Sequence, residues 1–316
     1  MKKKQNLPHW IRLVLFATIC FVTSSIQAFA GGGQHYPNGN ADFHEGMFPP
    51  SGFYFQNYTE IAKKDRLTNN SGDTAAVDLN VDVFTTAPRF IWSSPYSLFG
   101  ATYGAAVLVP IYRVDQQVNG PGGSSLVDSD DAGLGDLVIT PFILGYHLTE
   151  NLHMVLAMDV TIPTGDYDSD IPASTIISRN HWTFEPVFAI TYLWDRFDFS
   201  GKFMYDFHSE NDEYVTGGQK YKLDPGQEFH IDWAIGYALS DRVRLGLVGY
   251  DYWQTTDDEL DGVNVEDGKS QIHGIGPGIK WSPSPKYSFT LKHYWEYAAE
   301  NNPEGHVLKF KFAMAF

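Results

Sequence analysis

The chain has 316 residues, and its 22 Lys and Arg against 38 Asp and Glu give a formal net charge of −16. This acidic balance argues against a nucleic-acid partner and against peripheral docking on anionic lipid, because both need clustered basic residues. Aromatic residues make up 15% of the chain and glycine is frequent, with 29 residues. A soluble β-sandwich shares these features, and a transmembrane β-barrel predicts them together.

Residues 1–30 have the pattern of a cleavable signal peptide. Residues 2–4 are lysines, residues 13–22 form a short apolar stretch, and the segment ends on the small-x-small sequence Ala-Phe-Ala. A helix needs about 20 apolar residues to span a bilayer, so this stretch is too short for a membrane anchor. We therefore expect export and cleavage after Ala30. Cleavage removes Cys20, the single cysteine, so the mature chain has no disulfide and no thiol for catalysis.

The segment 31–51 comes next and has no strand pattern. Two interpretations remain open for it. It is either a disordered periplasmic tail, as chain termini often are, or a plug that folds into the lumen of a barrel. In the second case His35, Tyr36, His44 and Phe48 would line the path of a ligand.

Residues 52–316 divide into segments of the length that a tilted, membrane-spanning strand needs, about 9–11 residues. Twelve strands are predicted, an even number, as single-chain bacterial barrels have. The predicted strands are 52–63, 77–93, 99–112, 135–149, 151–163, 180–194, 196–208, 226–240, 242–256, 269–282, 286–299 and 304–316.

Several of these segments alternate between apolar and polar residues. In 226–240, apolar residues at every odd position from 229 to 239 alternate with Glu228, His230 and Asp232. In the last segment Leu308 and Phe310 alternate with lysines at 309 and 311. Alternation of period two gives a strand one wet face and one apolar face. The apolar face packs in the core of a sandwich but faces lipid in a membrane barrel.

The connections distinguish these two folds. Every second connection is long and polar, at 64–76, 113–134, 164–179, 209–225 and 257–268, with a shorter one at 300–303. The intervening connections are short, at 94–98, around Asn151, at Asp195, at Asp241 and at 283–285. Barrels of the outer membrane sort their loops in this way, with tight turns on the periplasmic side and long loops outside. The sequence therefore predicts an all-β, transmembrane antiparallel barrel of about 12 strands in the outer membrane of a Gram-negative bacterium.

The last predicted strand ends on an aromatic residue, Phe316. Outer-membrane barrels commonly end in such a strand, which their assembly machinery recognises. We expect this machinery, outer-membrane lipid and lipopolysaccharide as partners, together with a small hydrophobic permeant.

Charged and histidine side chains collect on the faces predicted to point inward. They are His153, Asp159, His181, Glu185, Lys202, Asp206, Glu228, His230, Asp232, Lys280, Lys292 and Glu296, with Lys309 and Lys311. One interpretation is a packed interior held by ion pairs, as small barrels often have. The other is a constriction that selects permeants by charge and width, with passive diffusion through it.

Acidic residues cluster in three predicted loops, at 128–131, 166–170 and 257–259. Oxygen ligands there suit divalent ions, but no calcium-loop spacing is complete, so solvated loops without a metal are expected. No cofactor is predicted. Enzyme motifs for a nucleophilic serine, a phosphate-binding loop or a zinc protease are absent from the sequence. The pair His208-Ser209, and Ser178 near His181, are the only candidates for a lipid-modifying enzyme, and adjacent strand residues point to opposite faces.

Seven segments resemble one bacterial family along the length of the mature chain. They are GGGQHYPNG at 31–39, PPSGFY at 49–54, PTGDY at 163–167, RNHWTFEP at 179–186, GQEFH at 226–230, GLVGY at 246–250 and GIGP at 274–277. Together they are similar to the proteins described as components of the meta-cleavage pathway of phenol degradation, which are outer-membrane transporter-like proteins. The resemblance implies uptake of small aromatic or other hydrophobic compounds. Residues 214–224 depart from the family pattern, and a structural or adhesive barrel with a packed lumen is the alternative.

Overall fold

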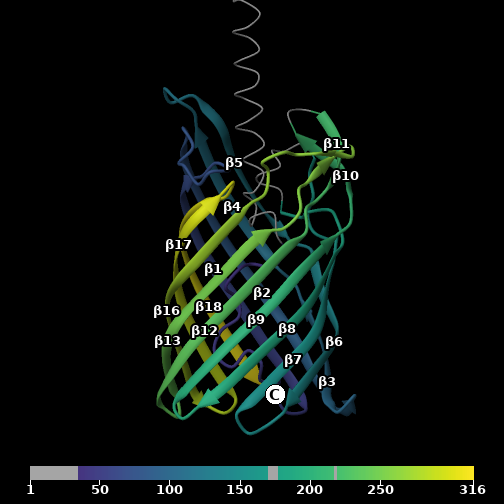
Figure 1. Ribbon diagram of the computed structural model, residues 1–316, viewed down its shortest axis with the longest axis vertical. Helices are drawn as coiled ribbons and strands as arrows, with labels where there is room; N and C mark the ends of the chain where they lie inside the picture. Colours follow the sequence, from purple (N-terminus) through teal and green to yellow (C-terminus); the bar gives the residue numbers. More distant parts are fainter. Residues whose placement is uncertain (1–34, 170–176, 217–218) are drawn as a thin grey trace, which may run out of the picture.

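The computed structural model describes residues 35–169, 177–216 and 219–316. The signal peptide expected at 1–30 lies outside these ranges. Among the described residues, no helix is long and apolar enough to cross a membrane. The described chain is built from strands, which wind into a tilted cylinder (Figure 1).

Twelve long strands of the described chain form one closed barrel, and each is antiparallel to both neighbours. The first strand pairs with the last on one side and with the second on the other, which closes the wall. The barrel strands are β1 (Gly52–Leu67), β2 (Asp78–Leu98), β3 (Ala101–Leu108), β6 (Leu137–His147), β7 (Leu152–Ile162), β8 (Thr183–Trp194), β9 (Phe197–His208), β12 (Glu228–Ser240), β13 (Val243–Gln254), β16 (Gln271–Ser284), β17 (Tyr287–Glu300) and β18 (Pro303–Ala315). The predicted fold class and strand number are confirmed.

The prediction of a loop at 113–134 is wrong. This stretch lies in a hairpin of β4 (Ile111–Asn119) and β5 (Ser125–Leu134), which extends the wall because β4 pairs with the first half of β2. The strand predicted at 99–112 is correspondingly shorter. It breaks between β3 and β4 at Pro110, which has no N–H to donate to a ladder.

The loop predicted at 209–225 also contains strands. Its β10 (Asn211–Thr216) and β11 (Gln219–Asp224) pair with each other, and β11 pairs with the short β14 (Glu259–Leu260), which continues to β15 (Val263–Asn264). This small sheet lies above the rim of the barrel (Figure 1). The acidic stretch at 257–259 is therefore partly structured.

Short and long connections lie at opposite ends of the barrel, except for the two-residue connection at 301–302, which lies at the same end as the long ones. The other short ones, at 99–100, 148–151, 195–196, 241–242 and 285–286, lie at the lower end in Figure 1, with the C-terminus. We call this the turn end and the opposite end the loop end. At the tightest turns the backbone adopts positive φ, as at Phe99 (54°) and Asp195 (52°). The loop sorting expected of an outer-membrane barrel is thus present.

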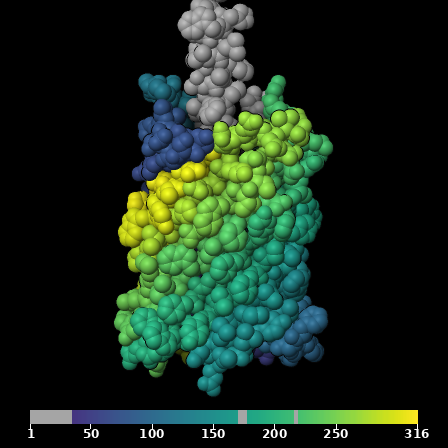
Figure 2. All heavy atoms as spheres, in the orientation of Figure 1, coloured from purple at the N-terminus to yellow at the C-terminus, as the bar shows by residue number. Residues whose placement is uncertain are grey.

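The wall is apolar outside and polar inside, the reverse of a soluble protein. Trp194, Leu247 and Phe310 are 62%, 43% and 39% exposed on the outer face. Lys292 and His230, on inward positions, are 1% and 0% exposed. Figure 2 shows the strands of this face packed into an unbroken wall. Because the strands pair into a closed barrel without a free edge and the outer face is apolar, the wall is suited to lipid.

Candidate functional site

The lumen holds residues 35–50, which cross it as an irregular segment. We call them the N-terminal segment. Towards the loop end, His35 hydrogen-bonds through Nδ1 to Thr183 Oγ1 (2.6 Å) and through Nε2 to Asp136 Oδ2 (3.0 Å). Towards the turn end, Ser93 Oγ donates to the carbonyl oxygen of Pro49 (2.9 Å). The N-terminal segment therefore follows the barrel axis from one end of the lumen towards the other.

Two buried, oppositely charged residues, on strands three places apart in the wall, hold the middle of this segment. Lys292 Nζ on β17 donates to the carbonyl oxygens of Gly39 (2.5 Å), Asn40 (3.0 Å) and Ala41 (2.8 Å). Asp232 on β12 accepts from Gly39 N (2.7 Å) and Ala41 N (2.8 Å), and also from the hydroxyl of Tyr36 (2.7 Å). Backbone donors and acceptors that are removed from water are thus paired with charged side chains, which make the stronger hydrogen bonds.

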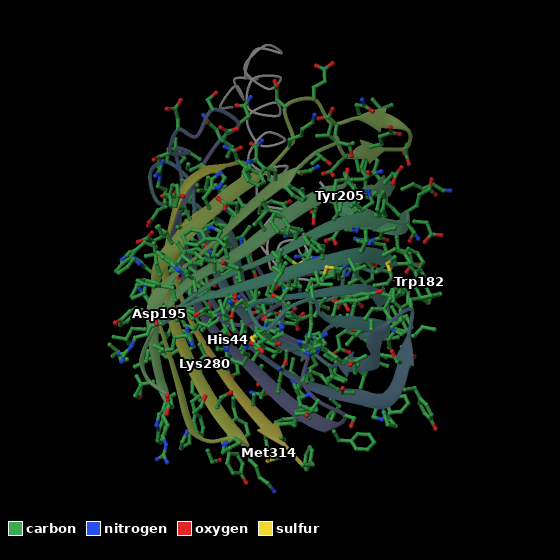
Figure 3. The ribbon with its side chains drawn as sticks, turned by 60° about the horizontal axis from the view of Figure 1, so that its bottom comes forward. His44, Trp182, Asp195, Tyr205, Lys280 and Met314 are labelled. Atoms are coloured by element: carbon green, nitrogen blue, oxygen red, sulfur yellow. The ribbon has the colours of Figure 1, made fainter. Side chains whose placement is uncertain are left out.

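Further ion pairs and hydrogen bonds continue towards the turn end. Lys311 Nζ lies 2.7 Å from Asp42 Oδ2. Burial opposes ionisation of Asp42, but Lys311, with two other lysines, outweighs it and holds the pKa of this carboxyl at about 2. The backbone N–H of His44 donates to Ser200 Oγ, and that of Gly46 to Thr191 Oγ1, both at 2.9 Å. His44 and Lys280 are labelled within the ring of strands in Figure 3.

Aromatic side chains of the segment fit against glycines of the wall. Gly236, Gly246 and Gly278 are paired in register across β12, β13 and β16, and the ring of Phe43 lies over them. Phe48 lies in the same way against Gly104 on β3 and Gly145 on β6. Phe43 is 1% exposed, and sequence reasoning missed it because the row of glycines appears only once the strands are in register.

A side chain at Gly278 is expected to displace Phe43. A Cβ built there would lie 3.2 Å from Phe43 Cζ, and its nearest neighbours are side-chain atoms rather than backbone, so the branched side chain of Gly278→Val forces the ring out of its groove. We expect faster thiol labelling of a reporter cysteine at Ala41, which is buried in the native segment. Phe43→Ala in the same chain should relieve the clash, and equal labelling of Gly278→Val and the parent would contradict the packing described.

The structure places the other inward residues as follows. Lys202 Nζ lies 4.2 Å from the ring centroid of Tyr36, and Lys280 Nζ donates to the carbonyl oxygen of Phe43 (3.3 Å). Three others contact the wall instead of the N-terminal segment. Asp159 bonds Thr140, His153 lies 2.7 Å from His147 between their Nδ1 atoms, and Glu296 accepts from Tyr250 and Lys64.

The remaining inward residues gather near the loop end. His181 precedes β8 and stacks edge-on with His35 and His208. Burial, with the two neighbouring imidazoles, lowers the pKa of His181 well below its usual value, so this ring is neutral at ordinary pH. Asp206, Glu228 and His230 form a second buried group beside them, with Glu185 close by.

The lumen is open at the turn end and nearly filled elsewhere. A cavity of about 600 Å³ lies between the N-terminal segment and the wall at the turn end, and we call it the vestibule. Towards the loop end, three further cavities have volumes of about 80, 20 and 60 Å³. The N-terminal segment therefore closes the barrel beyond the vestibule.

Seven basic and three acidic side chains line the vestibule, beside apolar ones. The basic residues are Arg89, Lys202, Arg242, Arg244, Lys280, Lys286 and Lys311, and the acidic ones are Glu45, Asp159 and Asp241. Its apolar lining includes Phe48, Ile91 and Ile143. In a chain with 22 basic residues against 38 acidic ones, this is a local concentration of positive charge.

The barrel and its filled lumen can be compared with known proteins. A family model described as "Putative MetA-pathway of phenol degradation" matches residues 64–312. The chain belongs to this family. No match was found among the curated proteins. Membership covers the barrel from the end of β1 to β18 and leaves the N-terminal segment outside the matched range.

Solved structures share the barrel of this family member. An outer-membrane channel from Pseudomonas putida F1 is similar over 88% of this chain and 100% of its own, with 20% identity and a TM-score of 0.76. Two other structures are more distant. The translocator domain of the autotransporter NalP from Neisseria meningitidis has 9% identity and a TM-score of 0.49, and the match covers 85% of this chain and 90% of that one. A mutant of the TodX monoaromatic hydrocarbon channel has 10% identity and a TM-score of 0.48, and the match covers 85% of this chain and 92% of that one. The first likeness establishes the fold, which is that of an outer-membrane barrel.

The serine and histidine candidates for catalysis are not paired in this family member. Ser178 Oγ donates to Asp136 Oδ1 (2.6 Å), and Ser209 Oγ accepts from Trp182 N (3.0 Å). Within the described residues neither hydroxyl has a hydrogen bond to a histidine, so the arrangement of a nucleophile activated by a base is not formed there.

In two of the predicted acidic loops, carboxylates accept hydrogen bonds from backbone N–H groups. Asp166 Oδ2 accepts from Leu134 N, and Asp258 Oδ1 from Gly226 N, each at 2.7 Å. Burial raises the pKa of Asp258 to about 6. These carboxylates tie loops together at the rim of the barrel.

Proposed function

We propose that this protein is a channel of the Gram-negative outer membrane for passive uptake of small aromatic or other hydrophobic compounds. The observation that carries the proposal is the 600 Å³ vestibule inside a closed, lipid-suited barrel. Its volume lies within the range of ligand pockets, about 300–1,000 Å³. Membership in a family described by phenol degradation supports the aromatic substrate class.

The lining of the vestibule suits an aromatic ring better than a sugar. Phe48, Ile91 and Ile143 offer an apolar surface, and the basic side chains around them offer hydrogen bonds to a phenolic or carboxylic oxygen. We infer that permeants are neutral or anionic rather than cationic. Among the described residues, nothing in the lumen resembles a site for energy coupling, so the proposed movement follows the concentration gradient.

We infer that the N-terminal segment acts as the plug of this channel. It fills the lumen beyond the vestibule, with His35, Tyr36, His44 and Phe48 in contact with the wall. Passage to the vestibule from the loop end therefore requires the segment to shift. The inward charged residues, from His153 to Glu296, then hold the plug or line the path that its displacement opens.

Because basic side chains outnumber acidic ones in the vestibule, we expect the channel to conduct anions in preference to cations in planar bilayers. Arg242 and Lys286 lie on its exposed rim, so changing them leaves the barrel core intact. The double variant Arg242→Glu and Lys286→Glu is expected to move the reversal potential in a KCl gradient towards cations. The reversal potential in planar bilayers measures this, and the pair Lys220→Glu and Lys222→Glu on the exposed β11 is the control.

We further infer that lipid and lipopolysaccharide surround the barrel and that the assembly machinery recognises β18. Phe316 N donates to Phe53 O (3.1 Å), which joins the end of the chain to the beginning of β1 where the barrel closes. Among the described residues, Ser178 and Ser209 have no hydrogen bond to a histidine, which argues for a channel without enzymatic activity.

A further inference from the structure

Four buried side chains from two adjacent strands point to one place near the loop end of the lumen. Asp206 and His208 lie two apart on β9, and Glu228 and His230 lie two apart on β12, so all four share the inward face. Asp206 and Glu228 are direct partners in the ladder. The side chains of Asp206, His208 and His230 are 0% exposed, and that of Glu228 is 6% exposed.

Each of these side chains has at least one polar atom without a hydrogen-bond partner among the described residues. They are both carboxylate oxygens of Asp206, Oε2 of Glu228, and Nε2 of His208 and of His230. Leaving buried polar groups unpaired is costly, and most such groups in native proteins have a partner. The contacts that these atoms make with one another are 3.3 to 3.7 Å long, which exceeds the length of a charge-assisted hydrogen bond and leaves space for an ion between them.

In three of these four side chains, a second polar atom already has a hydrogen-bond partner outside the cluster. His230 Nδ1 lies 2.8 Å from Asn38 Oδ1, so this nitrogen carries a proton, and Nε2 becomes a ligand atom when an ion displaces its proton. His208 Nδ1 lies 2.8 Å from Thr183 Oγ1. Glu228 Oε1 accepts from the hydroxyl of Tyr252 (3.0 Å). Such outer partners orient the ligands of metal sites.

The distances between the unpaired atoms fit a metal ion. His230 Nε2 lies 3.3 Å from Asp206 Oδ2 and 3.6 Å from Glu228 Oε2, which lies 3.7 Å from His208 Nε2. A tetrahedral ion with bonds of 2.0–2.1 Å separates its ligands by about 3.4 Å. One ligand atom each from Asp206, Glu228 and His230 lies within 4.8 Å of the other two. We propose that these three residues bind a divalent transition-metal ion, for which Zn²⁺ is the best match, with His208, 3.7 Å from Glu228, as the fourth ligand. Two carboxylates and two neutral imidazoles would balance its charge.

The neighbouring triad of His35, His181 and His208 is a weaker candidate. Four of its six nitrogens have hydrogen-bond contacts, because His35 Nδ1 and His208 Nδ1 both bond Thr183, His35 Nε2 bonds Asp136, and His181 Nδ1 contacts the carbonyl oxygen of Trp182. The four-residue cluster differs in having its unpaired atoms directed inward. The ion would lie beside Asn38, and so would fix β9 and β12 where they hold the N-terminal segment.

Metal content tests the proposal directly. Untagged protein is refolded in detergent from chelator-treated, metal-free denatured protein, and then equilibrated with Zn²⁺ and desalted. We expect one Zn²⁺ per chain by elemental analysis, and Co²⁺ in its place should show the visible absorption of a four-coordinate ion. With the signal peptide and Cys20 removed, no thiol can contribute. Zinc below stoichiometric amounts in correctly folded protein would overturn the proposal.

Matched variants assign the ligands. Glu228→Gln and His230→Gln should each weaken Zn²⁺ binding by at least about 100-fold, whereas His181→Gln, in the neighbouring triad, should leave it unchanged. Loss of zinc in His181→Gln with retention in His230→Gln would place the ion in the triad and refute the assignment. If the ligand variants do not fold, X-ray absorption of the zinc-loaded parent decides, since two nitrogen and two oxygen ligands near 2.0–2.2 Å are expected and any sulfur or purely aqueous shell contradicts the site.

Discussion

Deletion of residues 35–48 is expected to raise the single-channel conductance several-fold. These residues occupy the lumen beyond the vestibule, where the remaining cavities are 80 Å³ or less. Their removal leaves a barrel of twelve strands, whose interior is wider than that of the eight-stranded barrels that side chains fill. The barrel ladder is complete without the segment, so the wall should still close.

Conductance is measured in planar bilayers with parent and deletion proteins refolded in the same detergent. Slower migration of heated than of unheated samples in gel electrophoresis serves as the control for a folded barrel. A deletion variant that is folded but conducts as little as the parent would show that side chains of the wall, rather than the N-terminal segment, close the lumen.

Substitution of Lys292 should release the N-terminal segment while the barrel remains folded. Lys292→Met removes three hydrogen bonds from an ammonium group to the carbonyls of residues 39–41. The carbonyl of Gly39 keeps the hydroxyl of Tyr294 as a donor (3.0 Å), whereas those of Asn40 and Ala41 lose the ammonium donor. Hydrogen bonds to charged groups contribute about 1.5–3 kcal/mol each. A net loss of about 3 kcal/mol would raise the population of the released state by roughly 100-fold.

The labelling rate of a cysteine at Ala41 measures this release, since the mature chain offers no other thiol. Lys64→Met is the matched control, because Lys64 is a mostly buried lysine that pairs with Glu296 and not with the N-terminal segment. Asp232→Asn, which weakens the opposite side of the same clamp, should accelerate labelling as Lys292→Met does. Equal rates in Lys292→Met and Lys64→Met would contradict the clamp.

The barrel could be predicted from the sequence because its wall is a local pattern. Alternation such as that around Glu228, His230 and Asp232 predicts which side chains of a strand face the lumen and which face lipid. The alternating loop lengths predict which end of the barrel carries turns and which carries loops. The predictions were wrong where strand pairing depends on residues that are distant in the sequence. β4 pairs with the first half of β2, so a stretch that looks like a polar loop becomes wall.

The interior could be predicted only as a set of residues and not as an arrangement. Lys292 and Asp232 were placed on inward faces, but their common partner, residues 39–41, lies about 190 to 250 residues away in sequence. The sequence did contain one overlooked signal. An acid and a histidine two residues apart recur on β9, as Asp206 and His208, and on β12, as Glu228 and His230, and the register brings the two pairs together.

Solute flux into proteoliposomes tests the proposed channel most directly. Benzenesulfonate, a small aromatic anion, has no neutral form at working pH and crosses lipid slowly, so entry reports on the protein. We predict benzenesulfonate influx above that of protein-free liposomes for the parent, faster influx after deletion of residues 35–48, and exclusion of sucrose by the parent. Benzenesulfonate influx at the protein-free rate in both the parent and the deletion variant would contradict a channel for small aromatic compounds.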